Sequence, residues 1–339
     1  MESELTPFND FSLAFISILL EGAPFILLGT LISGFIDAYL PPGLIDRWLP
    51  KNKPLAVILS GLLGAIFPVC ECAIVPVIRR LIRKGLPVSC AITYMLSAPI
   101  INPIVVISTM SAFSSNVSQF SIRKVEADSS LALYMTSSRL LIAFIITVMV
   151  GLIILKFRPG SILKRSVLPD APPADDHDHD HKECDHEHGN CDHDHEHEHE
   201  HEHEHEHGPN KLVLAMRTAM RDFLETAMYF TIGVAITSVF RAYVTEDLVM
   251  IFNQTEITGV GLMMVLAFVL SLCSTSDAFI AANFPAPQSA RLAFLIFGPM
   301  MDVKLVFMYL SVFKSKFVVI LAISLFFAIG ILSYLWLRM

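Results

Sequence analysis

The sequence FPVCECAIVP (67–76) lies inside a long apolar run, and LSAPIINP (96–103) ends the next one. The first motif places Cys70, Glu71 and Cys72 between two prolines. Each proline removes a backbone hydrogen-bond donor, and a broken helix persists at membrane depth only where protein or a water-filled cavity covers it. The two motifs therefore predict the lining of a pathway through a membrane protein.

The whole chain has the composition of an integral membrane protein. Of its 339 residues, 54% are hydrophobic and only 17% are charged. We expect an all-α polytopic membrane protein, because an apolar run of about 20 residues is long enough to span a bilayer as a helix. The first run lacks a basic leader and a cleavage site, which predicts a retained span rather than a signal peptide. The eight apolar segments are 11–36, 54–78, 86–110, 131–156, 212–240, 257–273, 289–312 and 315–337.

A polar segment at 157–210 separates a first membrane repeat (1–156) from a second (211–339). Proline, aspartate, glutamate and histidine dominate this segment, which predicts a disordered loop. Much of the chain's acidity lies here, so the net charge of −8 says little about partners. The partners that we expect are membrane lipid and a metal or metalloid substrate, with no nucleic acid. The flanking basic residues predict a cytoplasmic loop in a protein of the cell (inner) membrane. They are Lys156, Arg158, Lys164, Arg165, Lys211, Arg217 and Arg221.

The two halves contain matching sequences. LLEGAPFILLGTLISGFIDAYL (19–40) aligns without a gap on FLETAMYFTIGVAITSVFRAYV (223–244), which pairs Glu21 with Glu225. Matching polar residues and helix breakers in two halves of a membrane protein predict a site at the repeat interface. With small gaps, the further pairs are Cys70 with Cys273, Pro99 with Pro299, and Asn102 with Asp302.

The segments around both cysteine motifs, 54–78 and 257–280, have two possible topologies. If both span, the protein has eight spanning helices and parallel repeats. If both are re-entrant hairpins with broken helices, six spans remain and the repeats are inverted. We favour the second topology, because it places more of the basic residues on the cytoplasmic side.

Carboxylates and thiols are the predicted lining of the pathway. Buried carboxylates are costly in a membrane and usually face a cavity, although Glu21 and Glu225 can also be explained as solvated residues at the membrane interface. Thiolates bind soft or borderline ions such as zinc, copper(I) or trivalent arsenic. The alternative is that the cysteines are small apolar residues that pack a tight turn. The second-half counterpart of the Cys70 motif is Cys273 with Ser274, Ser276 and Asp277.

Asn102 and Asp302 each follow a proline, Pro99 or Pro299, by three residues. A broken helix leaves backbone groups free, and these side chains can share a ligand with them. They can equally serve only to cap the broken helix.

The polar loop carries a dense metal-binding tract. Imidazole and thiolate groups suit zinc or another transition metal, and a flexible chain offers many overlapping sites, as expected of a metal buffer, sensor or feeder beside a pore. The alternative is a solvated spacer. The candidate ligands are His177, His179, His181, Cys184, His186, His188, Cys191, His193, His195, His197, His199, His201, His203, His205 and His207.

The sequence shows no Walker motif, no glycine-rich nucleotide loop and no HExxH motif, so we expect a protein that is not an enzyme and requires no cofactor.

The motifs FPVCECAIVP, LSAPIINP, LCSTSDAFIAA (272–282) and FGPMMD (297–302) resemble those of the predicted permease family that includes the ArsP-type organoarsenical efflux permeases. The resemblance covers about 11–110 and 212–337. It implies a multi-spanning permease, in some members an exporter of trivalent organoarsenicals through cysteine thiols at positions matching Cys70, Cys72 and Cys273. It also implies a second membrane subunit as a partner. A homodimer is the other assembly that we consider.

Two departures from the family pattern favour a metal cation or related species over an uncharged organoarsenical. Glu71 stands where the family often has a small residue, and the histidine tract is not a general family feature. We therefore expect a secondary transporter that exports a soft metal or metalloid. The alternatives are a membrane-anchored metal sensor, a subunit of a two-component permease complex, and a permease for a small non-metal solute.

Overall fold

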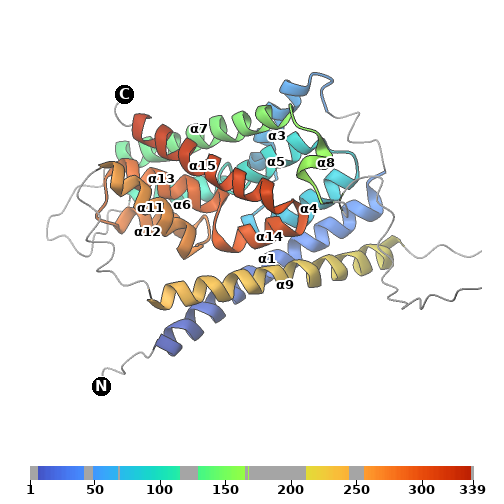
Figure 1. Ribbon diagram of the computed structural model, residues 1–339, viewed down its shortest axis with the longest axis horizontal. Coiled ribbons are helices and arrows are strands. Elements are labelled where there is room, and N and C mark those ends of the chain that lie inside the picture. The colour runs from blue at the N-terminus through green and yellow to red at the C-terminus, as the bar shows by residue number, and fades with distance from the viewer. Residues whose placement is uncertain are drawn as a thin grey trace, which may run out of the picture.

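The computed structural model describes residues 7–41, 49–67, 69–114, 129–164, 167, 211–243 and 256–336, and the regular elements within these ranges are helices (Figure 1). Their bounds are α1 (Pro7–Tyr39), α3 (Lys53–Ile66), α4 (Glu71–Arg83), α5 (Val88–Ser97), α6 (Pro103–Ser114), α7 (Ser129–Ile154), α8 (Pro159–Ile162), α9 (Lys211–Tyr243), α11 (Glu256–Leu270), α12 (Ser276–Asn283), α13 (Gln288–Met300), α14 (Val303–Val312) and α15 (Ser315–Trp336).

The prediction of an all-α polytopic membrane protein is confirmed. Five helical stretches in the described ranges are long and apolar enough to cross a membrane. They are Phe8–Tyr39, Ser130–Ile154, Leu212–Phe240, Gln288–Val312 (α13 with α14) and Ser315–Trp336.

Four of the expected apolar segments fold as pairs of shorter helices with a break between them. The pairs are α3 with α4, α5 with α6, α11 with α12, and α13 with α14. None of these eight helices alone has the roughly 20 residues that a span requires. The prediction of broken helices around both cysteine motifs is therefore confirmed.

Side chains cap two of the broken helices. Asn102 Oδ1 accepts a hydrogen bond from the Ile104 amide at 3.0 Å, at the start of α6. Asp302 Oδ1 accepts one from the Leu305 amide at 2.7 Å, at the start of α14. An oxygen in this position satisfies an amide that has no partner within its own helix. The capping role considered for both residues is thus present.

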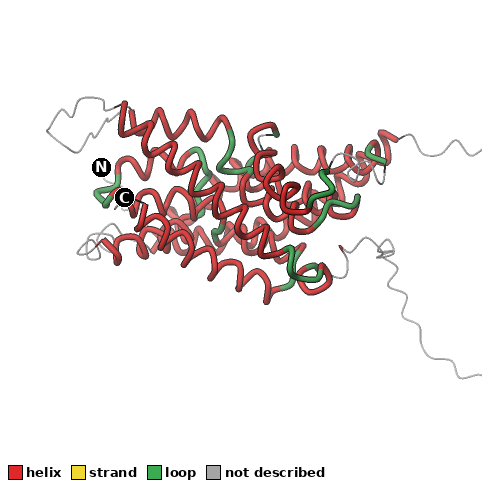
Figure 2. Tube along the Cα trace, turned by 90° about the horizontal axis from the view of Figure 1, so that it is seen from above, coloured by secondary structure: helices red, strands yellow, loops and turns green. Residues whose placement is uncertain are grey.

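The helices form layers. In Figure 1 the long helices α1 and α9 run together along one side, and α4 and α14 pack against them. Helix α13 is central: Leu292, Phe294 and Leu295 are fully buried, and its contacts include α11, α15 and α7. Figure 2 shows the same helices as a bundle elongated in one direction. The long apolar helices α1, α9 and α15 remain exposed over most of their length, as helices that face lipid do.

The two halves share internal pairings but differ in one respect. Helix α5 contacts α3 and α7, and helix α13 likewise contacts α11 and α15. By sequence, α12 is the counterpart of α4, and α14 is the counterpart of α6. Helix α1 packs mainly on α4 and α9, whereas α9 packs mainly on α1 and α14, with little or no packing on α12. The α1–α9 pair therefore lies to one side of an otherwise repeated arrangement.

Candidate functional site

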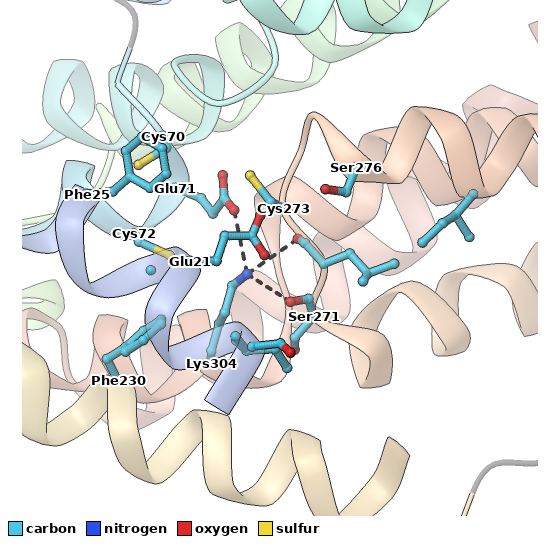
Figure 3. Close-up of a pocket in the computed structure, with 15 residues that line it drawn as sticks. Glu21, Phe25, Cys70, Glu71, Cys72, Phe230, Ser271, Cys273, Ser276 and Lys304 are labelled. Carbon is cyan, nitrogen blue, oxygen red and sulfur yellow. Dashed lines mark hydrogen bonds and ion pairs between the residues drawn. The ribbon is translucent and has the colours of Figure 1, made fainter. Parts of the chain in front are cut away.

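The breaks before α4 and α12 face one cavity of about 270 Å³. Residues from both halves line it, and in Figure 3 the carboxylates of Glu21 and Glu71 lie near the Lys304 ammonium. The lining residues are Ser17, Ile18, Glu21, Gly22, Phe25, Cys70, Glu71, Cys72, Phe230, Ser271, Leu272, Cys273, Ser276, Ile280 and Lys304.

Three cysteines lie in this lining. Cys70 is the residue before α4, Cys72 lies in the first turn of α4, and Cys273 lies in the break before α12. All three are free thiols, and Cys72 is the most buried of them. Among the described residues, no group of three His, Cys, Asp or Glu side chains is arranged to hold a metal ion. The thiols thus share a cavity without forming a closed metal cage.

Glu71 connects the two halves at the cavity. It is the first residue of α4 and is almost fully buried, with 1% exposure. Its Oε2 atom accepts a hydrogen bond from Ser274 Oγ at 3.2 Å, and its Oε1 atom lies 3.5 Å from Lys304 Nζ. A buried carboxylate is tolerated only with such partners.

Lys304 is the main site residue that the sequence reasoning missed. It lies in the first turn of α14, is 3% exposed, and forms ion pairs with Glu71 and with Asp302, each at 3.5 Å. A lone lysine in the apolar run VKLVFMYL was a detectable signal, because an ionisable residue inside a span usually faces an interior or a cavity.

Two further buried charged residues lie behind the cysteine motif of the second half. Arg139 of α7 donates to Thr109 Oγ1 at 2.7 Å and to the Ser274 carbonyl at 3.3 Å. Asp277 lies in the first turn of α12 and is 2% exposed, and its Oδ2 atom has no hydrogen-bond partner among the described residues. Gly298 leaves room for this carboxylate, since a Cβ there would lie 3.1 Å from Asp277 Oδ2. Arg139 was also missed from the sequence.

The matched glutamates occupy different environments. Glu21 lines the cavity. Glu225 lies outside the cavity lining and forms an ion pair with Arg79 of α4. Their equal positions in the repeat thus do not give equal surroundings.

The other predicted pathway residues also differ in whether they reach the cavity. Ser276 lines the cavity, and Ser274 and Asp302 contact its charged members. Pro99 and Asn102 are buried at the break between α5 and α6, and Pro299 is buried in the last turn of α13. These three lie outside the cavity lining.

The carboxyl end of α4 is bound to α1 and α9 by charged residues. Arg80 donates to both carboxylate oxygens of Asp222, at 2.9 and 3.0 Å, and to Asp37 at 3.3 Å. Lys84 donates to the Asp37 carbonyl at 2.7 Å, and Ser33 donates to Asp222 at 2.9 Å. Arg80 and Lys84 are therefore engaged in ion pairs inside the protein.

The histidine tract, with Cys184 and Cys191, lies outside the described residues. Its metal binding stays a prediction, as does the division of the chain at 157–210.

The comparisons with known proteins cover nearly the whole chain. A family model described as "Predicted permease" matches residues 7–337. "UPF0718 protein YcgR" of Bacillus subtilis is 37% identical over 309 residues, which are 91% of this chain and 90% of that protein. "Putative two-component membrane permease complex subunit" of Streptococcus mutans is 32% identical over 306 residues, which are 90% of this chain and 87% of that protein. No solved structure matches the chain.

Proposed function

Because this chain belongs to the predicted permease family, we propose that it is a secondary transporter that exports a soft metal or metalloid species. The substrate is a divalent metal or a trivalent arsenical, and it passes through the cavity between the two halves. Membership of a predicted permease family favours a transporter over an enzyme.

The observation that carries this proposal is that Cys70, Cys72 and Cys273 line one cavity although they come from both halves. Soft ions and trivalent metalloids prefer sulfur ligands. A site that conducts must bind its substrate well enough to admit it and weakly enough to release it. Thiols that share a cavity without forming a closed cage suit passage better than permanent retention of a metal.

The carboxylates supply charge for a cationic substrate. Glu21 and Glu71 line the cavity, and Asp302 contacts it through Lys304. The sequence contains no motif for ATP hydrolysis, so we attribute the driving force to an ion gradient, with these groups as candidates for coupling. The one-sided position of the α1–α9 pair suits a protein that alternates between two arrangements.

The histidine tract is proposed as a cytoplasmic buffer or feeder for zinc or another transition metal. Histidine alternating with acidic residues offers many overlapping sites of modest affinity. Deleting residues 175–208 should leave the maximal export rate intact and lower only the rate at low metal concentration. A complete loss of function, with the protein still in the membrane, would instead favour the membrane-anchored metal sensor.

The name of the Streptococcus mutans relative favours a second candidate, a subunit of a two-component permease complex. Purification of the full chain from its own host with a mild detergent would separate the two candidates. A second membrane protein in fixed stoichiometry, needed for transport, supports the complex. Transport by the purified chain alone supports a self-sufficient permease or homodimer.

The direct test of the proposal compares cells that express the full chain with cells that carry an empty vector. Growth and cellular metal content are measured with zinc, cobalt, nickel, copper, cadmium, arsenite and methylarsenite. We expect better growth and lower content for at least one of these compounds. Equal content across the whole panel, with the protein present in the membrane, would contradict a metal or metalloid exporter and favour a permease for a non-metal solute.

A further inference from the structure

The Lys304 ammonium lies inside a cage of oxygen atoms. It donates to the backbone carbonyl of Ser271 at 2.9 Å and to that of Leu272 at 3.4 Å. The carboxylates of Glu71 and Asp302 lie on its other sides, each at 3.5 Å (Figure 3 shows the contacts with Glu71 and the two carbonyls). The four partners come from three separate parts of the chain, so the folded protein assembles this cage.

The backbone is held in an unusual conformation where it supplies the two carbonyls. Ser271 has φ +46°, the left-handed region that residues other than glycine rarely adopt. Its hydroxyl donates to the Phe268 carbonyl at 3.1 Å and accepts from Thr237 Oγ1 of α9 at 3.3 Å, and the residue is 1% exposed. Such a conformation persists only where its surroundings impose it, and it is found most often at functional sites.

This set of partners has the chemistry of a monovalent-cation site. Hard cations take carbonyl and carboxylate oxygens. The carbonyl end of a broken membrane helix is where transporters place Na⁺, and the Ser271 and Leu272 carbonyls directly follow the end of α11. A free cation is not needed here, because Lys304 reaches in from the first turn of α14.

We propose that the Lys304 ammonium is the resident occupant of a monovalent-cation cage. It takes the place of a free alkali ion, so this permease uses no sodium at that position. One consequence rests on the proposed function: a cationic substrate can bind the Glu71 carboxylate only if it displaces the Lys304 ammonium. The other charged or titratable groups around Lys304 are Cys72 on α4, Cys273 in the break, Asp277 on α12 and Glu21 on α1, which lines the same cavity.

The test uses the purified full chain in detergent and needs no substrate, so its outcome is independent of whether the metal proposal holds. Thermal unfolding of Lys304→Ala is compared in sodium, potassium, ammonium and N-methylglucamine chlorides at one ionic strength. We expect a small cation to occupy the emptied cage and raise the melting temperature by several degrees over N-methylglucamine, which is too large to enter. The wild-type protein should melt at the same temperature in all four salts.

Lys304→Met is the matched control, because its uncharged side chain fills much of the same space. It should melt below the wild-type protein in every salt, with no dependence on the cation. The same melting temperature for Lys304→Ala in all four salts would overturn the proposal. If Lys304→Ala fails to fold, the salts are supplied during membrane extraction instead. Recovery of folded protein in a small-cation salt alone supports the cage, and no recovery in any salt overturns it.

Discussion

Lys304 Nζ lies 3.5 Å from Glu71 Oε1, and this ion pair joins the first turn of α14 in the second half to the first residue of α4 in the first half. Both side chains are nearly inaccessible, at 4% and 2% exposure. Separating the halves would take both of its partners, Lys304 and Ser274, from the buried Glu71 carboxylate, which is strongly unfavourable, whereas Lys304 would keep Asp302. The pair therefore couples the charge balance of the cavity to the relative position of the two halves.

The different surroundings of the matched glutamates predict different mutant behaviour. Glu21→Gln should lower transport several-fold with an unchanged melting temperature, because this exposed side chain lines the cavity. Glu225→Gln should lower the melting temperature and change transport less, because it removes the partner of Arg79. Flux and thermal unfolding are measured on the same preparations. Equal loss of flux in both variants would show that sequence symmetry, not the observed surroundings, determines the roles.

The bidentate pair of Arg80 with Asp222 should be strongly coupled. Arg80→Met leaves the buried Asp222 carboxylate without a cation and should cost about 3–5 kcal/mol of unfolding free energy, whereas Asp222→Asn should cost less because Arg80 keeps Asp37. The double variant should cost clearly less than the sum of the two, since it leaves neither charge unpaired. Denaturation of the detergent-solubilised protein by SDS gives the three values. Additivity within about 0.5 kcal/mol would show that the pair is not coupled.

Close packing of α9 on α14 depends on a glycine. A Cβ at Gly233 would lie 2.7 Å from the Lys304 Cα atom, so Gly233→Ala must push the two helices apart. We expect a loss of about 1–3 kcal/mol in stability together with reduced transport. Gly261→Ala is the control: a Cβ there meets nothing within 4 Å, and alanine favours helix by up to about 1 kcal/mol. Identical behaviour of the two variants would contradict the packing argument.

The one-sided packing of α1 and α9 predicts a second arrangement. In this second arrangement the two halves would exchange their packing. Helix α9 would pack on α12, the counterpart of α4, and helix α1 would pack on α6, the counterpart of α14. Spin labels carried by unnatural amino acids at Leu28 on α1 and Ile107 on α6 would report this, and both side chains are exposed. We expect a second, shorter distance whose population changes with the substrate. A single distance under all conditions would indicate that these helices remain on one side.

The sequence predicted the helices and their breaks because these depend on local properties. Apolar runs, prolines and the cysteine motifs lie next to each other in the chain, and they located the breaks before α4 and α12. The partners of Lys304 and Arg139 could not be obtained in this way, because each pairing joins residues far apart in the sequence. Reasoning from carboxylates alone also left out the cations that compensate them. Glu225 shows the limit of repeat matching: it forms an ion pair with Arg79, whereas the matched residue Glu21 lines the cavity.

Transport of a soft metal through cavity thiols is the central claim, and flux into liposomes containing the purified full chain tests it most directly. The substrate is the compound identified by the growth panel. We expect Cys70→Ser with Cys273→Ser to reduce flux at least tenfold. Cys90→Ser should transport like the wild-type protein, because Cys90 of α5 is buried against apolar residues of α3 and α7, outside the cavity lining. Full flux in the double variant, at equal protein incorporation, would contradict the claim that these thiols carry the substrate.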